Sequence, residues 1–584
     1  MGTAYEDLVS IYEKIEATTK RLEMTDHLVE LFTSVPPEIL DKVIYLTQGK
    51  LLPDFRGVEL GLAGKLVVRT LSFTSGISED EILELVRDKG DIGLAAQQAI
   101  EKKKQRSLFT NPLTVERVYG NLMRIAEASG AGSQDLKMKL LAELLHDSTP
   151  LEAKYIIKSV ARSMRLGIAD MTMIDALAVA FVSKERRDEI ERAFNVWSDL
   201  GRVAKLLAEE GEKGLDEVHL ELATPIRAML CERLSSLDEI FEKLGECAFE
   251  YKYDGLRIQA HIGEKEIKLF SRRLEDVTKQ FPDIESALRE SFLGKEGILE
   301  GEAVPVNLET GEFLPFQEVS HRRGRVHDLE RAKEEYPVHF FLFDCLYLDG
   351  EELLDEGLMD RRKKLEKSIE EREDVKLSTT LVTGKEEEAE DFLHESLDIG
   401  CEGLIAKALD SPYVAGTRGW NWIKFKKEYR EGIADTVDLV IVGAFAGRGR
   451  RAGTYGALLT AVYDEEDGMY KTVCKLGTGF DDETLATIPD RLEEQKIPAK
   501  DSKVDSDMEA DYWFRPEVVL EVLGAEITLS PTHTAAKGAM KEGAGLAIRF
   551  PRFTGRWRED KGPEDATTVA EIIRMYKEQE KVVS

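Results

Sequence analysis

Residues 250–257 read Glu-Tyr-Lys-Tyr-Asp-Gly-Leu-Arg, and this string decides how the chain is interpreted. It places the amine of Lys252, a tight Asp-Gly turn and the guanidinium of Arg257 within six residues. A free lysine has a pKa of about 10.4, so about one amine in two thousand is neutral at pH 7. A nucleophilic Lys252 therefore needs cations, a metal ion or burial that disfavour its proton. Taken alone, the Lys-x-Asp-Gly core is more typical of a charged surface turn.

Further candidate catalytic and binding residues follow downstream in the sequence. Lys424 and Lys426 alternate along a strand-like run, which puts both ammonium groups on one face of a strand. Glu302 and Glu402 lie inside apolar runs, where an unpaired charge is costly. Each glutamate fits a ligand of a divalent metal ion or of a ribose hydroxyl, and a structural salt bridge is the alternative. Phe343 offers a ring that stacks on a base, or it fills the core.

Length and charge limit the possible functions. The 584 residues allow three or four domains of about 150 residues each. A net charge of −32 argues against nucleic-acid binding if it is spread evenly, because phosphate contacts need Lys and Arg. Each local basic cluster is by itself more typical of a solvated face than of a binding site. The clusters are Lys102–Arg106, Arg162–Arg165, Lys424–Lys427, Arg448–Arg451 and Arg549–Lys561.

The sequence also predicts where in the cell the protein is found. No apolar run reaches the roughly 18 residues that a membrane span needs. The N-terminal residues lack the basic and apolar blocks of a signal peptide. The cysteines show no zinc-ligand spacing and indicate reduced thiols in an intracellular protein. They are Cys231, Cys247, Cys345, Cys401 and Cys474. We therefore expect a cytoplasmic protein without membrane contacts.

The spacing of apolar residues predicts three domains. Residues 1–217 show helical spacing and predict an all-α domain. Residues 218–429 mix strands and helices and predict an α/β domain rich in antiparallel strands. Residues 430–584 carry short β runs between Gly-rich turns, which favours a β-barrel of the OB type.

Individual elements are predicted in the last two domains. The strands expected in the second domain cover 247–253, 256–262, 267–271, 297–306 and 338–347, with helices over 283–290 and 361–370. The strands expected in the third domain cover 438–442, 456–463, 470–475 and 518–527, with helices over 482–496 and 569–579.

Seven strings, taken in order, resemble the ATP-dependent DNA ligases of the covalent nucleotidyltransferase superfamily. They are Glu250–Arg257, Ser271–Glu275, Leu299–Val304, Phe341–Tyr347, Cys401–Lys407, Trp422–Lys427 and Arg549–Lys561. Two helical strings, Gly132–Lys137 and Arg165–Asp170, resemble the DNA-binding domain of that family. The likeness covers nearly the whole chain and is strongest to archaeal members. One such string is weak evidence, whereas seven in order are specific.

The resemblance implies a role for each matching position. Lys252 is implied to become covalently adenylylated by ATP. Glu250 is implied to contact the adenine amine, and Phe343 to stack on the adenine ring. Arg272 and Glu302 are implied to approach the ribose and the phosphate.

The remaining implied roles concern the metal and the phosphates. Glu302 and Glu402 are the implied carboxylates of a Mg²⁺ site. The implied phosphate contacts are Arg257, Arg418, Lys424 and Lys426. Three residues near the end of the third domain are implied to orient the leaving pyrophosphate: Arg552, Arg558 and Lys561.

The family reaction has three steps. Lys252 takes AMP from ATP, the 5′-phosphate at a nick in double-stranded DNA takes that AMP, and the 3′-hydroxyl then displaces it. The geometry differs between the steps, so the last domain is expected to move between the nucleotide and DNA. The helical domain is expected to hold the DNA backbone without reading sequence. We expect a monomer with a nucleoid-associated function.

One string outside these motifs indicates a partner. Gln105, Leu108 and Phe109 stand in Gln-Arg-Ser-Leu-Phe, which is similar to the short peptides that bind sliding clamps. The alternative is a loop whose Leu108 and Phe109 pack inward. Because the chain resembles the DNA ligases, clamp binding is the favoured interpretation.

Other functions are weighed as alternatives. An RNA ligase or a capping-type guanylyltransferase belongs to the same superfamily, but the large helical domain argues against both. An NAD-dependent ligase is disfavoured because scattered cysteines cannot build that group's four-cysteine zinc module. A catalytically silent, clamp-associated DNA-binding scaffold should have lost its nucleophile or phosphate ligands, and Lys252, Lys424 and Glu402 are all present.

Overall fold

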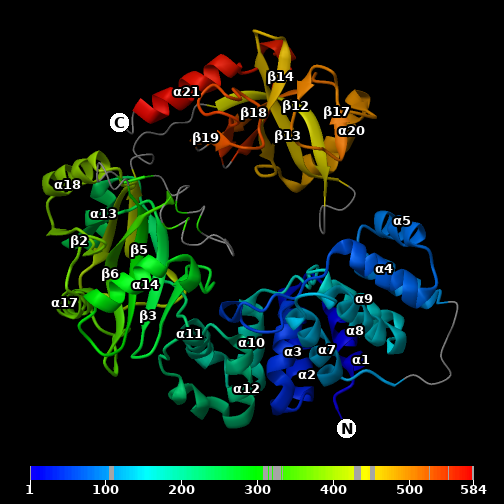
Figure 1. Ribbon diagram of the computed structural model, residues 1–584, viewed down its shortest axis with the longest axis horizontal. Helices are drawn as coiled ribbons and strands as arrows, with labels where there is room; N and C mark the ends of the chain where they lie inside the picture. Colours follow the sequence, from blue (N-terminus) through cyan, green and yellow to red (C-terminus); the bar gives the residue numbers. More distant parts are fainter. Residues whose placement is uncertain are drawn as a thin grey trace. The chain divides into compact units, whose positions relative to one another are not determined.

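The computed structural model describes residues 2–103, 111–306, 313–314, 319, 322, 331, 333, 335–426, 436–447, 454–524, 526–549 and 551–581. Contacts divide the chain into two compact units, Met1–Tyr429 and Arg430–Ser584. Figure 1 traces their helices and strands. The predicted clamp-binding residues Gln105, Leu108 and Phe109 lie outside the described residues. Among the described residues, no helix is both long and apolar enough to span a bilayer.

The first domain is helical, as predicted. Its α-helices are α1 (Tyr5–Glu16), α2 (Arg21–Ser34), α3 (Pro37–Gln48), α4 (Gly64–Ser75), α5 (Glu79–Lys89), α6 (Ile92–Glu101), α7 (Val115–Glu127), α8 (Ser133–Asp147), α9 (Pro150–Val160), α10 (Asp170–Phe181), α11 (Arg187–Trp197) and α12 (Leu200–Glu210). A 3₁₀ segment, η3 (Gly211–Glu217), follows α12.

Local sequence explains where α9 begins. The Thr149 hydroxyl accepts a hydrogen bond from the Glu152 N–H, and the Glu152 carboxylate accepts one from the Thr149 N–H. Pro150 occupies the first turn, where its missing N–H costs nothing. This reciprocal cap satisfies two backbone donors that a helix start otherwise leaves unpaired.

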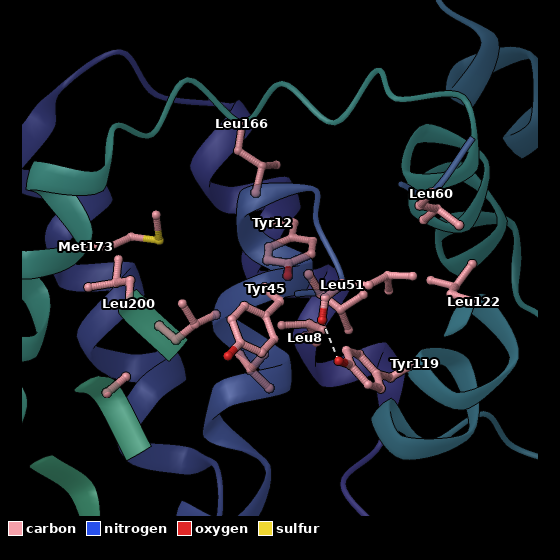
Figure 2. Packing of buried hydrophobic residues seen from close by; sticks show 14 of the residues in the cluster. Leu8, Tyr12, Tyr45, Leu51, Leu60, Tyr119, Leu122, Leu166, Met173 and Leu200 are labelled. Carbon is pink, nitrogen blue, oxygen red and sulfur yellow. Dashed lines mark hydrogen bonds between the residues drawn. The ribbon is translucent and has the colours of Figure 1, made fainter. Parts of the chain in front are cut away.

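Apolar side chains and buried tyrosines, among them Tyr12 and Tyr119, fill the space between these helices (Figure 2). The Tyr12 hydroxyl lies 2.9 Å from the Thr47 hydroxyl oxygen, and the Tyr119 hydroxyl donates to the Leu51 carbonyl. Both tyrosines thus bury a ring while keeping a partner for the polar end. At these two positions, therefore, no tyrosine hydroxyl is buried without a hydrogen-bond partner.

A charged cluster joins α1 to α9. The Glu16 carboxylate accepts hydrogen bonds from Lys154 Nζ at 2.6 Å and from Lys158 Nζ at 2.7 Å. Both lysines are buried, and Asp91 lies 3.3 Å from Lys158 Nζ. Burial disfavours the charged carboxylate, but the two ammonium groups outweigh it and hold the pKa of Glu16 below its ordinary value.

Replacing Glu16 with glutamine is expected to destabilise the helical domain at neutral pH and hardly at all in acid. The loss should be roughly 2 kcal/mol, because two buried ammonium groups lose their shared partner. A lowered pKa contributes stability above the unfolded-state pKa and loses it as the pH falls through the folded-state pKa. Thermal melting of both proteins between pH 7 and pH 3 measures the difference. Glu30→Gln, which breaks an exposed pair with Lys14, is the control. A pH-independent difference would contradict this account.

The second domain consists of two sheets with flanking helices, as the α/β prediction expected. The five-stranded sheet has the order β1-β11-β10-β2-β9, and the six-stranded sheet contains β4-β3-β5-β6-β7 with β8 beside β6. The strands are β1 (Leu230–Arg233), β2 (Cys247–Tyr251), β3 (Leu256–Ile262), β4 (Ile267–Ser271), β5 (Gly297–Pro305), β6 (Val338–Leu348), β7 (Glu351–Glu352), β8 (Val375–Leu377), β9 (Thr380–Thr383), β10 (Gly403–Ala408) and β11 (Arg418–Lys426). The helices are α13 (Leu237–Leu244), α14 (Pro282–Ser291), α17 (Leu358–Ser368) and α18 (Glu386–Asp398).

The Lys252 string lies where the chain passes from one sheet to the other. β2 belongs to the five-stranded sheet and β3 to the six-stranded sheet, and residues 252–255 connect them. Each sheet has its own hydrophobic cluster. The candidate nucleophile is therefore held at a junction between two rigid layers.

The described part of the C-terminal unit is a β domain with two α-helices. Its main sheet has the order β15-β17-β12-β13-β14-β16, and β18 pairs with both β12 and β21. The strands are β12 (Thr436–Ala446), β13 (Tyr455–Asp464), β14 (Met469–Leu476), β15 (Lys496–Ile497), β16 (Val504–Asp505), β17 (Tyr512–Phe514), β18 (Val519–Leu523), β19 (Glu526–Ser530), β20 (Gly545–Arg549) and β21 (Arg552–Trp557). The helices are α20 (Asp482–Leu492) and α21 (Val569–Lys581).

One predicted strand of this unit is wrong. Residues 518–527 were expected to form a single strand, but β18 ends at Leu523 and β19 begins at Glu526. The two strands pair in different sheets, β18 with β12 and β21, and β19 with β20. Gly524 lies at the break, where a Cβ atom would stand 2.5 Å from Ile548 Cγ2. The apolar pattern continues through this corner, so it did not reveal the change of sheet.

Candidate active site

Backbone hydrogen bonds fix Lys252 opposite Glu402. The Lys252 N–H donates to the Gly403 carbonyl and the Glu402 N–H donates to the Lys252 carbonyl, both at 2.8 Å. These bonds continue the antiparallel ladder between β2 and β10 by one residue. The Lys252 ammonium donates to the Glu402 carboxylate. Two residues 150 positions apart in the sequence are thereby brought into direct contact.

The charge state of Lys252 reflects this contact. Burial favours the neutral amine, but Glu402, and more weakly Glu302 and Asp254, outweigh it and raise the pKa of Lys252 above its ordinary value. The lysine is therefore an ammonium ion when no nucleotide is present. It must leave the Glu402 carboxylate and lose a proton before it can act as a nucleophile.

Lys424 and Lys426 lie near this pair on β11. Lys426 Nζ is 3.0 Å from the Glu402 carboxylate. Burial lowers the pKa of Lys424, and the nearby charges of Lys252 and Lys426 lower it further. The structure thus gathers three ammonium groups, two of which contact the Glu402 carboxylate. Such a cluster suits the phosphates of a nucleotide, which carry several negative charges.

Glu302 lies on β5, across from Arg257 on β3. Burial raises the pKa of Glu302 to about 7, with Lys252 and Arg257 opposing the rise and Glu402 adding to it. A carboxylate in this state fits a hard divalent cation, whose charge offsets the cost of burying it. Among the described residues no cluster of three or more potential ligands occurs.

The turn after Lys252 packs tightly against β5. A Cβ atom on Gly255 would stand 2.4 Å from the Ala303 carbonyl oxygen and 3.0 Å from Glu302 Cγ. On the other side, the ring of Tyr253 stacks on Phe341 with centroids 4.3 Å apart. Glycine is needed here because backbone approaches backbone. The turn therefore fixes the distance between Lys252 and Glu302.

Replacing Gly255 with alanine is expected to slow the transfer of AMP from ATP to the protein by about 100-fold, because a displacement on the order of 1 Å has effects of that size. Single-turnover labelling with α-labelled ATP measures it. Gly419→Ala is the matched control, since the space around that position is open. A Gly255→Ala protein labelled at the rate of the unmodified chain would refute the close contact.

Glu250 and Phe343 lie beside a lysine that the sequence did not single out. The Lys407 ammonium donates to the Glu250 carboxylate at 2.7 Å, and both side chains are buried. Lys407 Nζ also stands 4.8 Å from the Phe343 ring centroid and 4.3 Å from that of Trp422. The contacts predicted for Glu250 and Phe343 with adenine therefore adjoin a buried cation. The only indication of Lys407 in the sequence was its position at the end of Cys401–Lys407, one of the strings that resemble the ligase family.

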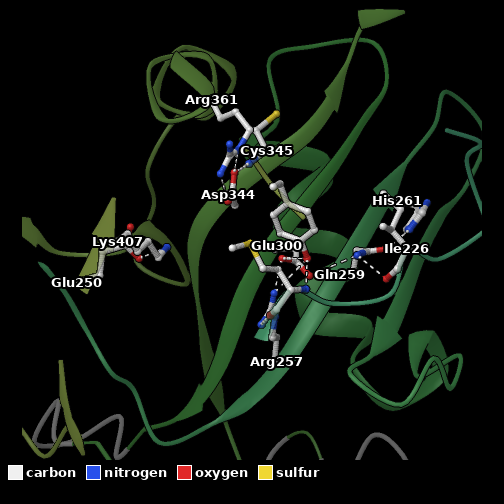
Figure 3. A network of polar contacts seen from close by, with 12 residues as sticks. Ile226, Glu250, Arg257, Gln259, His261, Glu300, Asp344, Cys345, Arg361 and Lys407 are labelled. Carbon is white, nitrogen blue, oxygen red and sulfur yellow. Dashed lines mark hydrogen bonds and ion pairs between the residues drawn. The ribbon is translucent and has the colours of Figure 1, made fainter. Parts of the chain in front are cut away.

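Arg257 belongs to a buried network (Figure 3). Its guanidinium donates to the Glu300 carboxylate at 2.6 Å, to the Met229 carbonyl at 2.8 Å and to the Tyr413 hydroxyl at 3.2 Å. Arg257 Nε is buried and has no hydrogen-bond partner among the described residues. These contacts tie β3 to β5 and to the segment before β1. The predicted contact of Arg257 with phosphate stays a prediction.

Gln259 extends the same network by two residues along β3. Its side-chain amide accepts from the Ile226 N–H at 2.8 Å and donates to the Ile226 carbonyl at 3.2 Å. Arg272, which follows β4, is exposed and lines a pocket together with Arg257, Gln259 and Glu300. Arg272 is thus placed on the Arg257 side of the six-stranded sheet.

The remaining cations that were predicted to contact phosphate or pyrophosphate lie far from Lys252 in the sequence. Arg418 begins β11, is exposed and donates to the Cys231 carbonyl at 3.3 Å. Arg552, Arg558 and Lys561 belong to the C-terminal unit, a different compact unit from that of Lys252. Arg552 is exposed at the start of β21.

Comparison with known proteins identifies the family. Three family models match the chain: DNA ligase N terminus over residues 4–178, ATP dependent DNA ligase domain over 228–426 and ATP dependent DNA ligase C terminal region over 451–561. DNA ligase 2 of Korarchaeum cryptofilum is 51% identical over 581 residues, which cover 99% of this chain and 98% of that protein. The chain belongs to the ATP-dependent DNA ligases. DNA ligase 2 of Thermofilum pendens is 52% identical to this ligase over 597 residues, which cover 100% of this chain and 99% of that protein.

A solved structure supports the fold of the ligase. The chain named Pmar-Lig_PreS3 aligns with a TM-score of 0.55 at 16% identity, covering 94% of this chain and 99% of that chain. At that identity the likeness concerns the fold alone. The multidomain architecture, with an N-terminal helical domain, a central nucleotidyltransferase domain and a C-terminal β domain, agrees with the prediction.

Proposed function

We propose that this ligase seals nicks in double-stranded DNA through an AMP group carried on Lys252. The observation that carries the proposal is the contact of Lys252 with Glu402, beside Lys424 and Lys426. A lysine held by a carboxylate is a poor nucleophile, but bound phosphates compete for the surrounding cations. The cluster therefore suits a lysine that is activated only when the nucleotide is present.

In the first step, Lys252 Nζ loses its proton and attacks the α-phosphorus of ATP. A phosphorus–nitrogen bond forms, the bond to the bridging oxygen breaks, and pyrophosphate leaves with the electron pair. Lys424 and Lys426 offset the charge that develops on the phosphates. Glu302 and Glu402 are the residues that would hold Mg²⁺, which would supply positive charge beside the phosphates.

The next two steps transfer AMP and close the nick. An oxygen of the DNA 5′-phosphate attacks the adenylyl phosphorus, and the bond to Lys252 breaks as the amine regains a proton. The 3′-hydroxyl then attacks the activated 5′-phosphorus and AMP leaves. Glu250 and Phe343 are proposed to hold the adenine, with Arg257, Arg272 and Arg418 near ribose and phosphate.

The C-terminal unit is proposed to act in the first step. Arg552, Arg558 and Lys561 are the pyrophosphate-orienting cations of this proposal, and they belong to a different unit from Lys252. The two units must therefore come together around ATP and separate before DNA binds. The antiparallel pairing of β12 with β13 and of β13 with β14 supports a barrel of the OB type.

Nick sealing with different nucleotides tests the proposal. The protein, Mg²⁺ and a labelled nicked duplex are incubated with ATP, GTP or NAD. We expect joined strands and a protein-bound, acid-labile AMP with ATP. Labelling by GTP alone would instead establish the guanylyltransferase alternative, and no label at all would establish the silent scaffold. The clamp contact through Gln105, Leu108 and Phe109, the monomeric state and the cytoplasmic, nucleoid-associated location stay predictions.

A further inference from the structure

Asp438 lies near the start of β12 and contacts two of the three predicted pyrophosphate-orienting side chains, Arg558 and Lys561. Arg558 Nη1 donates to the two carboxylate oxygens of Asp438 at 2.8 and 2.7 Å. Lys561 Nζ donates to Asp438 Oδ2 at 2.7 Å. Asp438 is only 8% exposed. No motif of the sequence analysis includes this aspartate, which lies 120 positions before Arg558.

The backbone holds the Asp438 carboxylate in place. The Asp438 N–H donates to the Thr567 hydroxyl at 3.0 Å, and the Thr567 N–H donates to the Asp438 carbonyl at 2.9 Å. In the antiparallel pairing of β12 with β18, Asp438 lies opposite Glu521. The Arg558 N–H donates to the Val519 carbonyl at 2.9 Å on the same strand. Aspartate and arginine are thus fixed to one sheet independently of their own ion pair.

Two other carboxylates lie near Arg558, but one is exposed and the other is farther from the guanidinium than Asp438. Asp560 accepts from Arg558 Nε at 3.0 Å and from Nη2 at 2.8 Å, but it is exposed. The Glu521 carboxylate stands 3.9 Å from Arg558 Nη1. In the described part of the chain, Asp438 is the carboxylate that contacts both Arg558 and Lys561. It joins them into one group at a fixed spacing.

We propose that Asp438 is a positioning residue for the transfer of AMP from ATP to Lys252. It holds Arg558 and Lys561 side by side, so that both meet the pyrophosphate end of ATP together. Charge-assisted hydrogen bonds of this kind fix geometry as well as supply energy. This inference rests on the pyrophosphate-orienting role proposed above for Arg558 and Lys561. Pyrophosphate leaves only in the first step, so the effect of Asp438 is confined to that step.

The test is Asp438→Asn, which keeps the shape of the side chain and removes its charge. Formation of the protein–AMP bond is measured in single turnovers over a range of ATP concentrations. Sealing of a nicked duplex that already carries the 5′-adenylate is measured with the same preparation. We expect the maximal rate of AMP transfer to fall by about tenfold or more, the size of a lost orienting contact. The ATP concentration at half-maximal rate should not rise, because the two cations remain. Sealing of the adenylated duplex should stay within about twofold.

Two companion variants make the result decisive. Asp464→Asn removes an equally buried aspartate of the same unit, whose partner is Lys471 at 2.7 Å, and it should leave AMP transfer unchanged. Arg558→Ala should slow AMP transfer at least as much as Asp438→Asn. If Arg558→Ala has no effect, the proposed pyrophosphate role is wrong. If Arg558→Ala slows the first step and Asp438→Asn does not, or if Asp438→Asn slows both reactions equally, the positioning role alone is refuted.

Discussion

Replacing Lys252 with arginine should abolish the formation of protein-bound AMP and lower nick sealing with ATP by at least about 1,000-fold. Arginine does not lose its proton in proteins, so it offers no free electron pair to phosphorus. It keeps the positive charge that the Glu402 carboxylate contacts in this structure. The variant therefore removes the nucleophile and retains the ion pair, which separates chemistry from folding.

The measurement combines three readouts. Mass spectrometry after incubation with ATP and Mg²⁺ locates AMP, gel analysis follows nick sealing, and thermal melting reports the fold. Lys268→Arg is the control, since Lys268 pairs with Asp276 at 3.4 Å on the surface of the same domain. AMP found on another side chain, or on Lys252→Arg itself, would falsify the assignment of the nucleophile.

The second large effect concerns stability. Arg361 and Asp344 form an ion pair in which neither side chain is exposed. Arg361 donates to Asp344 Oδ1 at 2.8 Å, to Asp344 Oδ2 at 2.9 Å and to the carbonyls of Glu356 and Ser411. Arg361→Met leaves a buried carboxylate without its cation, which costs about 3 to 5 kcal/mol. For a domain of about 200 residues this lowers the melting temperature by about 10 °C.

Two further variants isolate the charge. Arg361→Met combined with Asp344→Asn should recover part of the loss, because no ionised group is left unpaired. Arg372→Met, which breaks an exposed pair with Glu290 at 3.0 Å, should change stability by less than about 1 kcal/mol. Calorimetry of the four proteins gives the values. If the double variant melts no higher than Arg361→Met, lost packing rather than the buried charge explains the effect.

Arg361 is also expected to affect the proposed nucleotide site through its neighbour. Asp344 directly follows Phe343 on β6, and its Oδ1 accepts the Cys345 N–H at 2.9 Å. The ion pair therefore fixes the strand that presents Phe343. A destabilised β6 is expected to weaken nucleotide binding as well as folding.

Local patterns in the sequence were enough for much of the fold. The predicted strands 256–262 and 267–271 match β3 and β4 at their observed bounds, and successive side chains of a strand alternate between its two faces. The same alternation placed Lys424 and Lys426 on one face of β11. It failed at Gly524, because a strand that changes sheet at a corner keeps its apolar pattern.

The sequence by itself determined the family, the candidate nucleophile and most secondary structure, because motifs and periodicity are local properties of the chain. The tertiary structure decided which charges meet. Glu250 faces Lys407 from 157 positions away, Lys252 faces Glu402 from 150, and Asp438 faces Arg558 from 120. Strand order and register fix such pairs, and neither is encoded in the spacing of residues within one strand. The contact of Lys252 with Glu402, which raises the pKa of Lys252, follows from such a pairing.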